Sequence, residues 1–590
     1  MRNPTRRLLL LLAAVTARTA LAAPNCPPLG PVFEKPRNFN SSAAIRSALA
    51  NLTQALTARD QDNSAAVLAN TTSYSIEVFS TSGDTPVVFS WHHTASALAA
   101  SNSSAAGVKR VDSSTVYRLG SLTKVFAVYT WLAQDGDAKW NEPITKYVPE
   151  LAAAAERAKA ENDPVKNVPW QDVTIGALAS QLSGAIRDYG LLGELSQQIN
   201  QSTAVSLGLP PLNNSDPMLN PCGQWPLCNR TQFFDGLLQA YPSYAPFTTP
   251  AYTNTGFQIL AYALESIKGK SFKSMMQDSI LSPLGLNRTY YDSAPAEQGV
   301  IPGNVSDSTW YYQLGDESPA GNMYSSVGDL SVLGRSILGS SLLAPALSRR
   351  WLKPAALTSE PVAGVGYPWG IRRVILPLAN GKRTVDAYNK AGRIGFYSSL
   401  INLLPDYDVG FSVLIAGPAI PGNSNFNLAD LIGARLLPAL EAAAREQANA
   451  KYAGDYRSAS TNSSLRLTTQ DDRPGLGIEN WLSNGTDMQT TAVVLAAGYT
   501  GVQPSIRLYP TGLETVRADG SRSAAFKATF EDVGLPARND MFSTDCGSWV
   551  TLTSVTYGTQ SLDEFVFEID KAGKVVSIES PALRVVMKKT

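Results

Sequence analysis

Histidine and cysteine are scarce in this sequence, which has only two of the first and four of the second among its 590 residues. No two cysteines have the Cys-x-x-Cys spacing, so a zinc site is not expected, and neither is any other metal or organic cofactor. The Gly-x-Ser-x-Gly turn of many serine hydrolases is also missing. Because His92 and His93 are neighbours on a predicted strand, at most one can face the interior, and an ordinary Ser-His-Asp hydrolase is not expected.

The sequence has no excess of charge of either sign, with 49 Lys and Arg residues against 49 Asp and Glu residues. Without a basic field to hold phosphate groups, nucleic acid is not an expected partner. The apolar run Leu8 to Val15 lies between a cluster of arginines and the small residues Ala20 and Ala22, and Arg18 follows it too early for a membrane span. These features predict a secretory signal peptide over residues 1–23 and no membrane association after its removal.

Features of exported proteins recur along the rest of the chain. Sequons for N-linked glycans, Asn-x-Ser/Thr, occur at Asn40, Asn51, Asn70, Asn102, Asn200, Asn213, Asn229, Asn287, Asn304, Asn462 and Asn484. We therefore expect a secreted, extracellular glycoprotein, whose four cysteines suit two disulfides. Cys222 and Cys228 are placed to close a short loop, and a pair of Cys26 with Cys546 follows by elimination only. The alternative is a set of unpaired, buried thiols.

Strand and helix patterns divide the chain into two predicted domains. Within residues 24–450, strand-like segments come early and late, and helical periodicity fills the middle. This order predicts an α/β sandwich, in which the early and late strands share one antiparallel sheet beside a helical lobe. Residues 451–590 contain short alternating segments separated by Gly, Asp and Asn turns, which predict a C-terminal all-β domain, either a sandwich or a small barrel.

A Ser-x-x-Lys motif, SLTK at Ser121 to Lys124, occurs once, where a predicted strand runs into a predicted helix. Its spacing places the hydroxyl and the amine on one face of the helix. The helix N-terminus stabilises negative charge on Ser121, and a desolvated Lys124 has a lowered pKa and becomes available as a base. The alternative is that Ser121 only caps the helix and that Lys124 is solvated.

A Tyr-x-Asn motif, YTN at Tyr252 to Asn254, also occurs once, just ahead of a second helical segment. A phenol beside ammonium groups can ionise near neutral pH and take the proton of Ser121. Asn254 can donate a hydrogen bond to a substrate carbonyl and accept one from Lys124. The alternative is a half-buried turn tyrosine followed by an asparagine that caps the helix.

The triplet Lys390-Ala391-Gly392 and the following Arg393 form a third candidate element. We expect an edge strand along the site, in which Gly392 lets substrate approach the backbone. The amide of Arg393 would then pair with the amide of Ser121 as an oxyanion hole. The same triplet recurs at 571–573, where two alternating segments around a polar turn predict a hairpin instead.

Taken in this order, the three motifs resemble the signature elements of the serine β-lactamase and penicillin-binding-protein superfamily, and the tyrosine form of the second is similar to the class C branch. The whole chain is similar to secreted β-lactamase-like proteins of filamentous fungi. The resemblance implies that Ser121 attacks an acyl carbonyl, that Lys124 and Tyr252 handle its proton, and that Asn254 holds the substrate. Lys390 would supply positive charge to Tyr252 or to a substrate carboxylate. Which of Lys124 and Tyr252 is the general base stays open.

Three residues bear on the substrate. Gln181 stands where many relatives have His, Ala391 replaces a hydroxyl residue that helps true β-lactamases to bind the antibiotic carboxylate, and Arg393 adds charge at the rim. The last two differences favour an ester or amide over a lactam. We therefore expect a serine hydrolase that forms an acyl-enzyme on Ser121 with a small-molecule or peptide-like substrate. An acyltransferase with the same intermediate and a non-catalytic binding pseudoenzyme are the alternatives, and the sequence predicts no oligomeric state.

Overall fold

The computed structural model describes residues 25–61, 70–82, 85–101, 106–190, 194–212, 219, 222–223, 226–379, 381–538, 540–544 and 546–590. The predicted signal peptide and the sequon residues Asn102 and Asn213 lie outside these residues. The chain forms two compact units. One unit comprises Asn38–Val374 and Asp386–Ala439, and the other comprises Met1–Arg37, Ile375–Val385 and Leu440–Thr590. The domain boundary between residues 450 and 451 stays a prediction.

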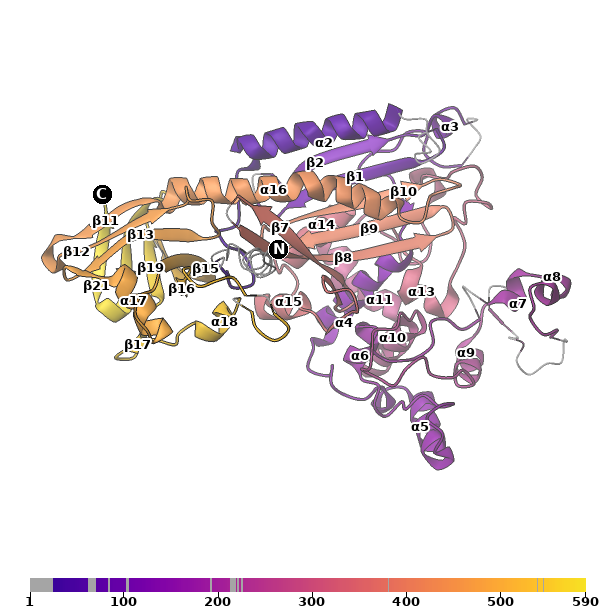
Figure 1. Ribbon diagram of the computed structural model, residues 1–590. Helices are drawn as coiled ribbons and strands as arrows, with labels where there is room; N and C mark the ends of the chain where they lie inside the picture. The colour runs from indigo at the N-terminus through magenta and orange to yellow at the C-terminus, as the bar shows by residue number, and fades with distance from the viewer. Residues whose placement is uncertain are drawn as a thin grey trace, which may run out of the picture. The chain divides into compact units, whose positions relative to one another are not determined.

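An antiparallel sheet of eight strands, counted over the described residues, organises the unit that holds the three motifs (Figure 1). Its strand order is β2-β1-β10-β9-β8-β7-β6-β5. The early hairpin joins the late strands because β1 pairs with β10 from Ser73 opposite Ala416 to Ser80 opposite Val409. The predicted α/β fold is thereby confirmed. The strands are β1 (Ser73–Ser80), β2 (Val87–His93), β5 (Ala356–Leu357), β6 (Ala363–Val365), β7 (Gly370–Leu378), β8 (Gly381–Ile394), β9 (Tyr397–Leu404) and β10 (Val409–Ala416).

Helices cover both faces of this sheet, which explains why every residue of β1, β9 and β10 is buried. Glu77 of β1 accepts a hydrogen bond of 2.6 Å from Ser331, in the helix α14 (Val327–Leu338). The neighbouring Tyr74 donates to Asp60, in the helix α2 (Ala43–Gln61). Because residues 74 and 77 point to opposite faces of the strand, α14 and α2 lie on opposite faces of the sheet.

A helical lobe carries two of the motifs. A short 3₁₀ turn, η2 (Gly120–Leu122), continues into α4 (Thr123–Asp135), and α10 (Thr255–Lys268) and α13 (Ser318–Gly321) pack against α4. The other helices are α3 (Ser96–Ala99), α5 (Pro149–Glu161), α6 (Ile175–Ala179), α7 (Leu195–Gln198), α8 (Gln201–Ser206), α9 (Arg230–Leu237), α11 (Phe272–Met276), α12 (Ser282–Leu284) and α15 (Pro345–Trp351). The long helix α16 (Ser424–Tyr452) belongs to both units.

The second unit contains a sheet of nine strands within the described residues, in the order β12-β11-β21-β20-β19-β16-β15-β13-β14. An additional pairing of β12 with β13 closes it into a barrel, which confirms the predicted C-terminal β domain. Aromatic side chains, among them Trp481, Phe526, Phe565 and Phe567, fill its core. The strands are β11 (Gly454–Ser458), β12 (Ser463–Thr468), β13 (Leu476–Ser483), β14 (Thr486–Asp487), β15 (Pro504–Val516), β16 (Arg522–Asp532), β19 (Glu564–Ile569), β20 (Val575–Ser580) and β21 (Val585–Lys589). Two short strands pair separately, β17 (Thr556–Tyr557) and β18 (Gln560–Ser561).

Two segments of this unit, one confirmed as a hairpin and one found to be a helix, were both predicted from alternating sequence patterns. The triplet at 571–573 lies in the turn between β19 and β20, as the hairpin prediction requires. The apolar segment at 491–497 is one of the short segments of residues 451–590 whose pattern predicts strands, but it belongs to the helix α17 (Met488–Ala497). The side chain of Asp487 caps this helix at its start and Gly498, in the left-handed region, ends it. These caps lie outside the apolar run, which on its own does not distinguish a strand from a helix. A second, shorter helix is α18 (Ser548–Thr551).

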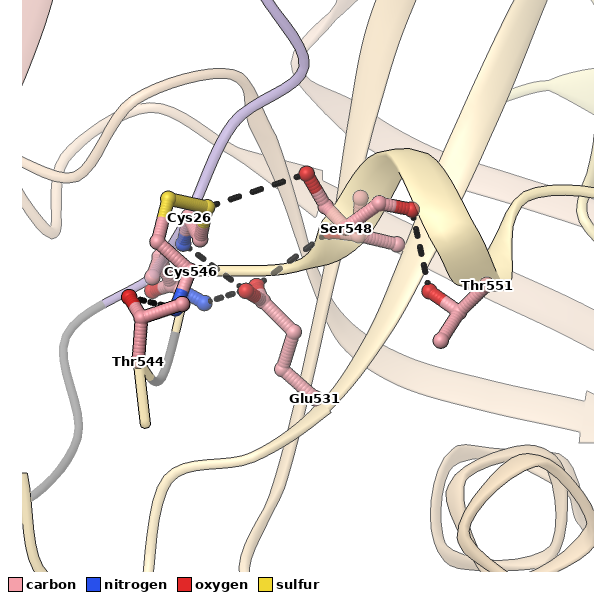
Figure 2. The surroundings of a disulfide bond; sticks show 8 residues. Cys26, Glu531, Thr544, Cys546, Ser548 and Thr551 are labelled. Atoms are coloured by element: carbon pink, nitrogen blue, oxygen red, sulfur yellow. Dashed lines mark hydrogen bonds between the residues drawn. A yellow bond between two sulfur atoms is a disulfide. The ribbon is translucent and has the colours of Figure 1, made fainter. Parts of the chain in front are cut away.

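A disulfide joins Cys26 to Cys546 within the barrel unit (Figure 2). Figure 2 also shows Glu531 of β16 beside the bridge, where its carboxylate accepts a hydrogen bond of 2.8 Å from the backbone N–H of Cys26. Val32 and Phe33 are part of the same hydrophobic core as the barrel strands. The first described residues of the chain therefore pack with its last residues.

Candidate active site

The structure brings Ser121, Lys124 and Tyr252 together. Ser121 lies in the turn η2, and its Oγ is 2.6 Å from the hydroxyl of Tyr252 and 3.2 Å from Nζ of Lys124. Ser121 does not cap α4, because Leu122 occupies the N-cap position of this helix and no side chain makes a capping bond there. A hydroxyl in contact with an amine and a phenol is the arrangement that activates a nucleophile by proton transfer.

The strand β8 lies directly against the turn that holds Ser121. Gly120 has a φ of +53°, and a Cβ on it would lie 2.6 Å from the amide nitrogen of Arg393. A Cβ on Gly392 would lie 2.7 Å from the amide nitrogen of Ser121 and 2.0 Å from the carbonyl oxygen of Leu119. We expected Gly392 to admit substrate to the backbone; instead, the space beside it is filled by the turn around Ser121. The two glycines thus hold the amides of Ser121 and Arg393 on adjacent segments.

Lys124 is fully buried, and burial lowers the pKa of its amine to about 7. Its Nζ donates to Oδ1 of Asn254 at 2.5 Å and to the backbone carbonyl of Ala320 at 2.7 Å. Both of these partners are acceptors only. In the protonated form the third N–H of Lys124 donates to Oγ of Ser121, and in the neutral form the two acceptors leave the lone pair on that side.

Asn254 is held by the acidic residue Asp188. Asn254 occupies the N-cap position of α10, but its side chain makes no capping bond. Its Nδ2 instead donates to Oδ1 of Asp188 at 2.6 Å. An amide that donates to a carboxylate at one end has its oxygen fixed at the other, and this oxygen faces Lys124. Burial raises the pKa of Asp188, and burial together with the charge of Asp188 raises the pKa of Glu317, the second acidic neighbour of Lys124.

Three cationic groups surround the ring of Tyr252. Nζ of Lys124 lies 4.9 Å from its centroid, Cζ of Arg187 4.8 Å and Nζ of Lys390 5.5 Å. Lys390 is buried, and burial lowers the pKa of its amine to about 8. These basic groups therefore lie around the phenol whose hydroxyl contacts Ser121.

Gln181 fixes the backbone of the YTN segment. Its Oε1 accepts a hydrogen bond of 2.6 Å from the amide of Thr253, and its carbonyl accepts one of 2.8 Å from the amide of Ala251. These bonds lie on both sides of Tyr252. The expectation that Gln181 affects the packing beneath the site therefore agrees with its position.

Asp188, Arg187 and Glu317 were not singled out from the sequence. They belong to no motif with a fixed spacing, and each contacts the site only through the tertiary fold. The nearest signal is the position of Asp188 seven residues after Gln181, in a segment whose backbone accepts the amides of the YTN element: the carbonyl of Arg187 accepts from Asn254 at 2.7 Å. Among the described residues, no group of three or more His, Cys, Asp or Glu side chains has the geometry to hold a metal ion.

The remaining predicted site residues are cysteines and the asparagines of the sequons. Cys222 and Cys228 form a disulfide, and every sequon asparagine within the described residues is exposed: Asn40, Asn51, Asn70, Asn200, Asn229, Asn287, Asn304, Asn462 and Asn484. Exposure is what a glycan on each of them requires. In the part of the chain that the structure describes, no helix has both the length and the apolar character that crossing a bilayer demands.

Comparisons with known proteins found similar sequences. A beta-lactamase-like protein of Arthroderma benhamiae is 29% identical, over 98% of both chains. A protein of a Phoma species named as a probable hydrolase is 26% identical over 86% of this chain and 83% of its own. The D-alanyl-D-alanine-carboxypeptidase/endopeptidase AmpH of Escherichia coli is 27% identical over 37% of this chain and 47% of its own.

Two family models match the chain in succession. The model for the C-terminal domain of beta-lactamase-like proteins matches residues 444–590, which include the barrel strands. The beta-lactamase model matches residues 76–428, which include SLTK, YTN and KAG. This second match covers more than half of the chain, and the protein therefore belongs to the β-lactamase family.

Proposed function

We propose that this protein is a serine hydrolase that forms an acyl-enzyme on Ser121 and cleaves an ester or an amide. The observation that carries the proposal is the meeting of three side chains: Oγ of Ser121 lies 2.6 Å from the hydroxyl of Tyr252 and 3.2 Å from Nζ of Lys124. Membership of a hydrolase family agrees with it.

Lys124 is the base that takes the proton of Ser121 in this proposal. A neutral amine has two N–H groups and one lone pair. The two acceptors Asn254 and Ala320 use both N–H groups, which leaves the lone pair for the hydroxyl of Ser121. A pKa of about 7 makes the neutral amine available at neutral pH. Tyr252, whose hydroxyl already points at Oγ, gives its proton to the leaving group and recovers the proton that Lys124 took from Ser121, so that the net transfer is from Ser121 to the leaving group.

The reaction has two halves. In the first, the Oγ–carbon bond forms, the bond from carbon to the leaving alcohol or amine breaks, and the proton of Ser121 reaches that leaving group. In the second, water repeats the attack and releases the acid. The amides of Ser121 and Arg393, on segments packed against each other, bind the developing oxyanion. Lys390 keeps positive charge beside Tyr252.

The substrate belongs to the small-molecule or peptide-like acyl compounds. Ala391 leaves the site without the hydroxyl that helps to bind the carboxylate of a lactam. Esters and amides are therefore better candidate substrates than lactams. Secretion is part of the proposal, and the exposed sequon asparagines and the two disulfides support it.

Mass spectrometry after incubation with a fluorophosphonate, and separately with a penicillin, tests the acyl-enzyme. We expect a single adduct on the peptide that contains Ser121. The adduct should be absent from Ser121→Ala and retained in Ser282→Ala, an exposed serine on α12. A protein that binds neither reagent covalently at Ser121 under any condition would be a binding module and not an enzyme.

A further inference from the structure

Arg187 is a surface arginine whose side chain is held in place. The side chain is 66% exposed, yet its Nε lies 3.2 Å from Oδ2 of Asp188 and its Cζ lies 4.8 Å from the ring centroid of Tyr252. The backbone is fixed as well, because its carbonyl accepts the amide of Asn254 at 2.7 Å. A guanidinium that is fixed at Nε and stacked on a ring has less rotamer freedom left to lose when it binds a ligand.

Basic side chains gather around the ring over which Arg187 lies. The three charged groups found over the ring of Tyr252 are all cations, and two of them, Lys124 and Lys390, are buried. Asp188 forms an ion pair with Arg187, and its two oxygens already contact Asn254 and the Nε of Arg187. The exposed side chain of Arg187 lies over the ring of Tyr252, whose hydroxyl is 2.6 Å from Oγ of Ser121.

We propose that Arg187 is a specificity-determining residue that binds an anionic group of the substrate, such as a carboxylate. A planar guanidinium presents paired N–H donors that match the two oxygens of a carboxylate. The inference rests on the proposed hydrolase function and narrows its substrate to acyl compounds that carry a negative charge. Arg187 differs from Lys390 in this role, because Lys390 is buried beside Tyr252.

Two pairs of esters test the proposal and locate the anion. In the first pair, mono-p-nitrophenyl glutarate carries a carboxylate in the acyl part and p-nitrophenyl valerate does not. In the second, 3-acetoxybenzoate carries one in the leaving group and phenyl acetate does not. We expect Arg187→Gln to lower the ratio of kcat/KM for the anionic over the neutral member at least about tenfold in one pair. Arg187→Lys keeps the positive charge but loses the paired N–H donors of the guanidinium, and it should give an intermediate ratio.

The matched control is Arg157→Gln, an exposed arginine on α5, which should leave both ratios as in the wild type. Equal losses on both members of both pairs would mean that Arg187 acts only on Tyr252 or on folding, and would overturn the proposal. Ratios that do not change would overturn it as well.

A binding measurement separates this proposal from the hydrolase proposal. Calorimetric titration of glutarate into Ser121→Ala needs no turnover, and we expect it to detect binding that weakens at least about tenfold in Ser121→Ala with Arg187→Gln. Equal affinity of the two variants, or no binding to either, overturns the role of Arg187. A wild-type protein that binds glutarate through Arg187 but acylates with no ester would instead overturn the hydrolase.

Discussion

Lys124 and Asn254 are joined by a hydrogen bond of 2.5 Å between Nζ and Oδ1, although 130 residues separate them in the sequence. The bond determines which way the amine faces. With one N–H committed to Asn254 and another to Ala320, the remaining direction is that of Ser121. The same bond depends on Asp188, which orients the amide of Asn254 from its other end. Asp188 thereby acts on the amine without touching it.

The two buried lysines should give a bell-shaped pH profile of kcat/KM for a neutral ester. Lys124 must be neutral to act as a base, so activity is lost as the pH falls below its pKa of about 7. Lys390 must be charged to support Tyr252, so activity is lost as the pH rises above its pKa of about 8. Stopped-assay rates between about pH 5 and pH 10 measure both limbs.

The variant Lys390→Arg assigns the alkaline limb. Arginine stays protonated over this whole range, so the limb at about pH 8 should move to higher pH while the acidic limb stays in place. An alkaline limb that stays at its wild-type position in Lys390→Arg would show that Lys390 is not the group that titrates there.

Loss of Asp188 should slow the reaction without unfolding the protein. Asp188→Ala removes the acceptor of Asn254, and we expect kcat/KM to fall about 10- to 100-fold, as for a lost hydrogen bond to a charged group. Asp188→Asn keeps an acceptor oxygen and should lose less. Because the charge of Asp188 raises the pKa of Lys124, its removal should also shift the acidic limb to lower pH.

Asp172→Asn, at an exposed position, is the matched control and should leave both the rate and the limb unchanged. A profile of Asp188→Asn whose acidic limb stays in place, together with a rate equal to the wild type, would contradict the positioning role.

The motifs could be predicted from the sequence because each is local. Ser121 and Lys124 are three residues apart in a helical turn, a spacing that brings their side chains near to each other, and Tyr252 and Asn254 form a short motif that directly precedes a helix. The β strands of the sheet could be predicted for a similar reason, since β1, β2, β9 and β10 are continuous apolar or alternating segments.

The supporting residues could not be predicted in this way. Asp188 and Glu317 are acids in loops or short turns, and most acids in such positions are solvated. Only the tertiary fold reveals that they lie next to Lys124. Gly392 is a second example. The sequence predicts a close approach to the backbone at this glycine, but the segment that approaches it is the turn around Ser121, more than 250 residues away in the sequence.

Gln181 should tolerate histidine better than an apolar residue. Its Oε1 accepts the amide of Thr253 at 2.6 Å, and an imidazole nitrogen can accept the same bond, whereas leucine leaves the buried amide without a partner. We expect Gln181→Leu to lower kcat/KM at least about tenfold and Gln181→His to lower it less. Parallel measurements of the unfolding temperature separate a displaced Tyr252 from a general loss of stability. Equal rates for the two variants would argue against the bond to Thr253.

The Cys26–Cys546 disulfide should stabilise the barrel unit more than the Cys222–Cys228 disulfide stabilises the other unit. The first bridge joins residues 520 positions apart and ties the segment before Phe33 to the barrel, while the second closes a loop with a separation of only 6. A cross-link between distant residues removes more conformational freedom from the unfolded chain, typically about 2–5 kcal/mol for a native bridge.

Calorimetric unfolding of the two double serine variants measures the difference. Replacement of Cys26 and Cys546 leaves Glu531 as the main polar anchor of the first described residues, through the amide of Cys26 and the side chain of Asn25. We expect the transition of the barrel unit to move down by several degrees, with the acylation of Ser121 by a fluorophosphonate preserved at lower temperature. Replacement of Cys222 and Cys228 should leave the barrel transition in place. A barrel transition that is unchanged without the long-range bridge would mean that Glu531 and the apolar contacts of Phe33 hold the segment by themselves.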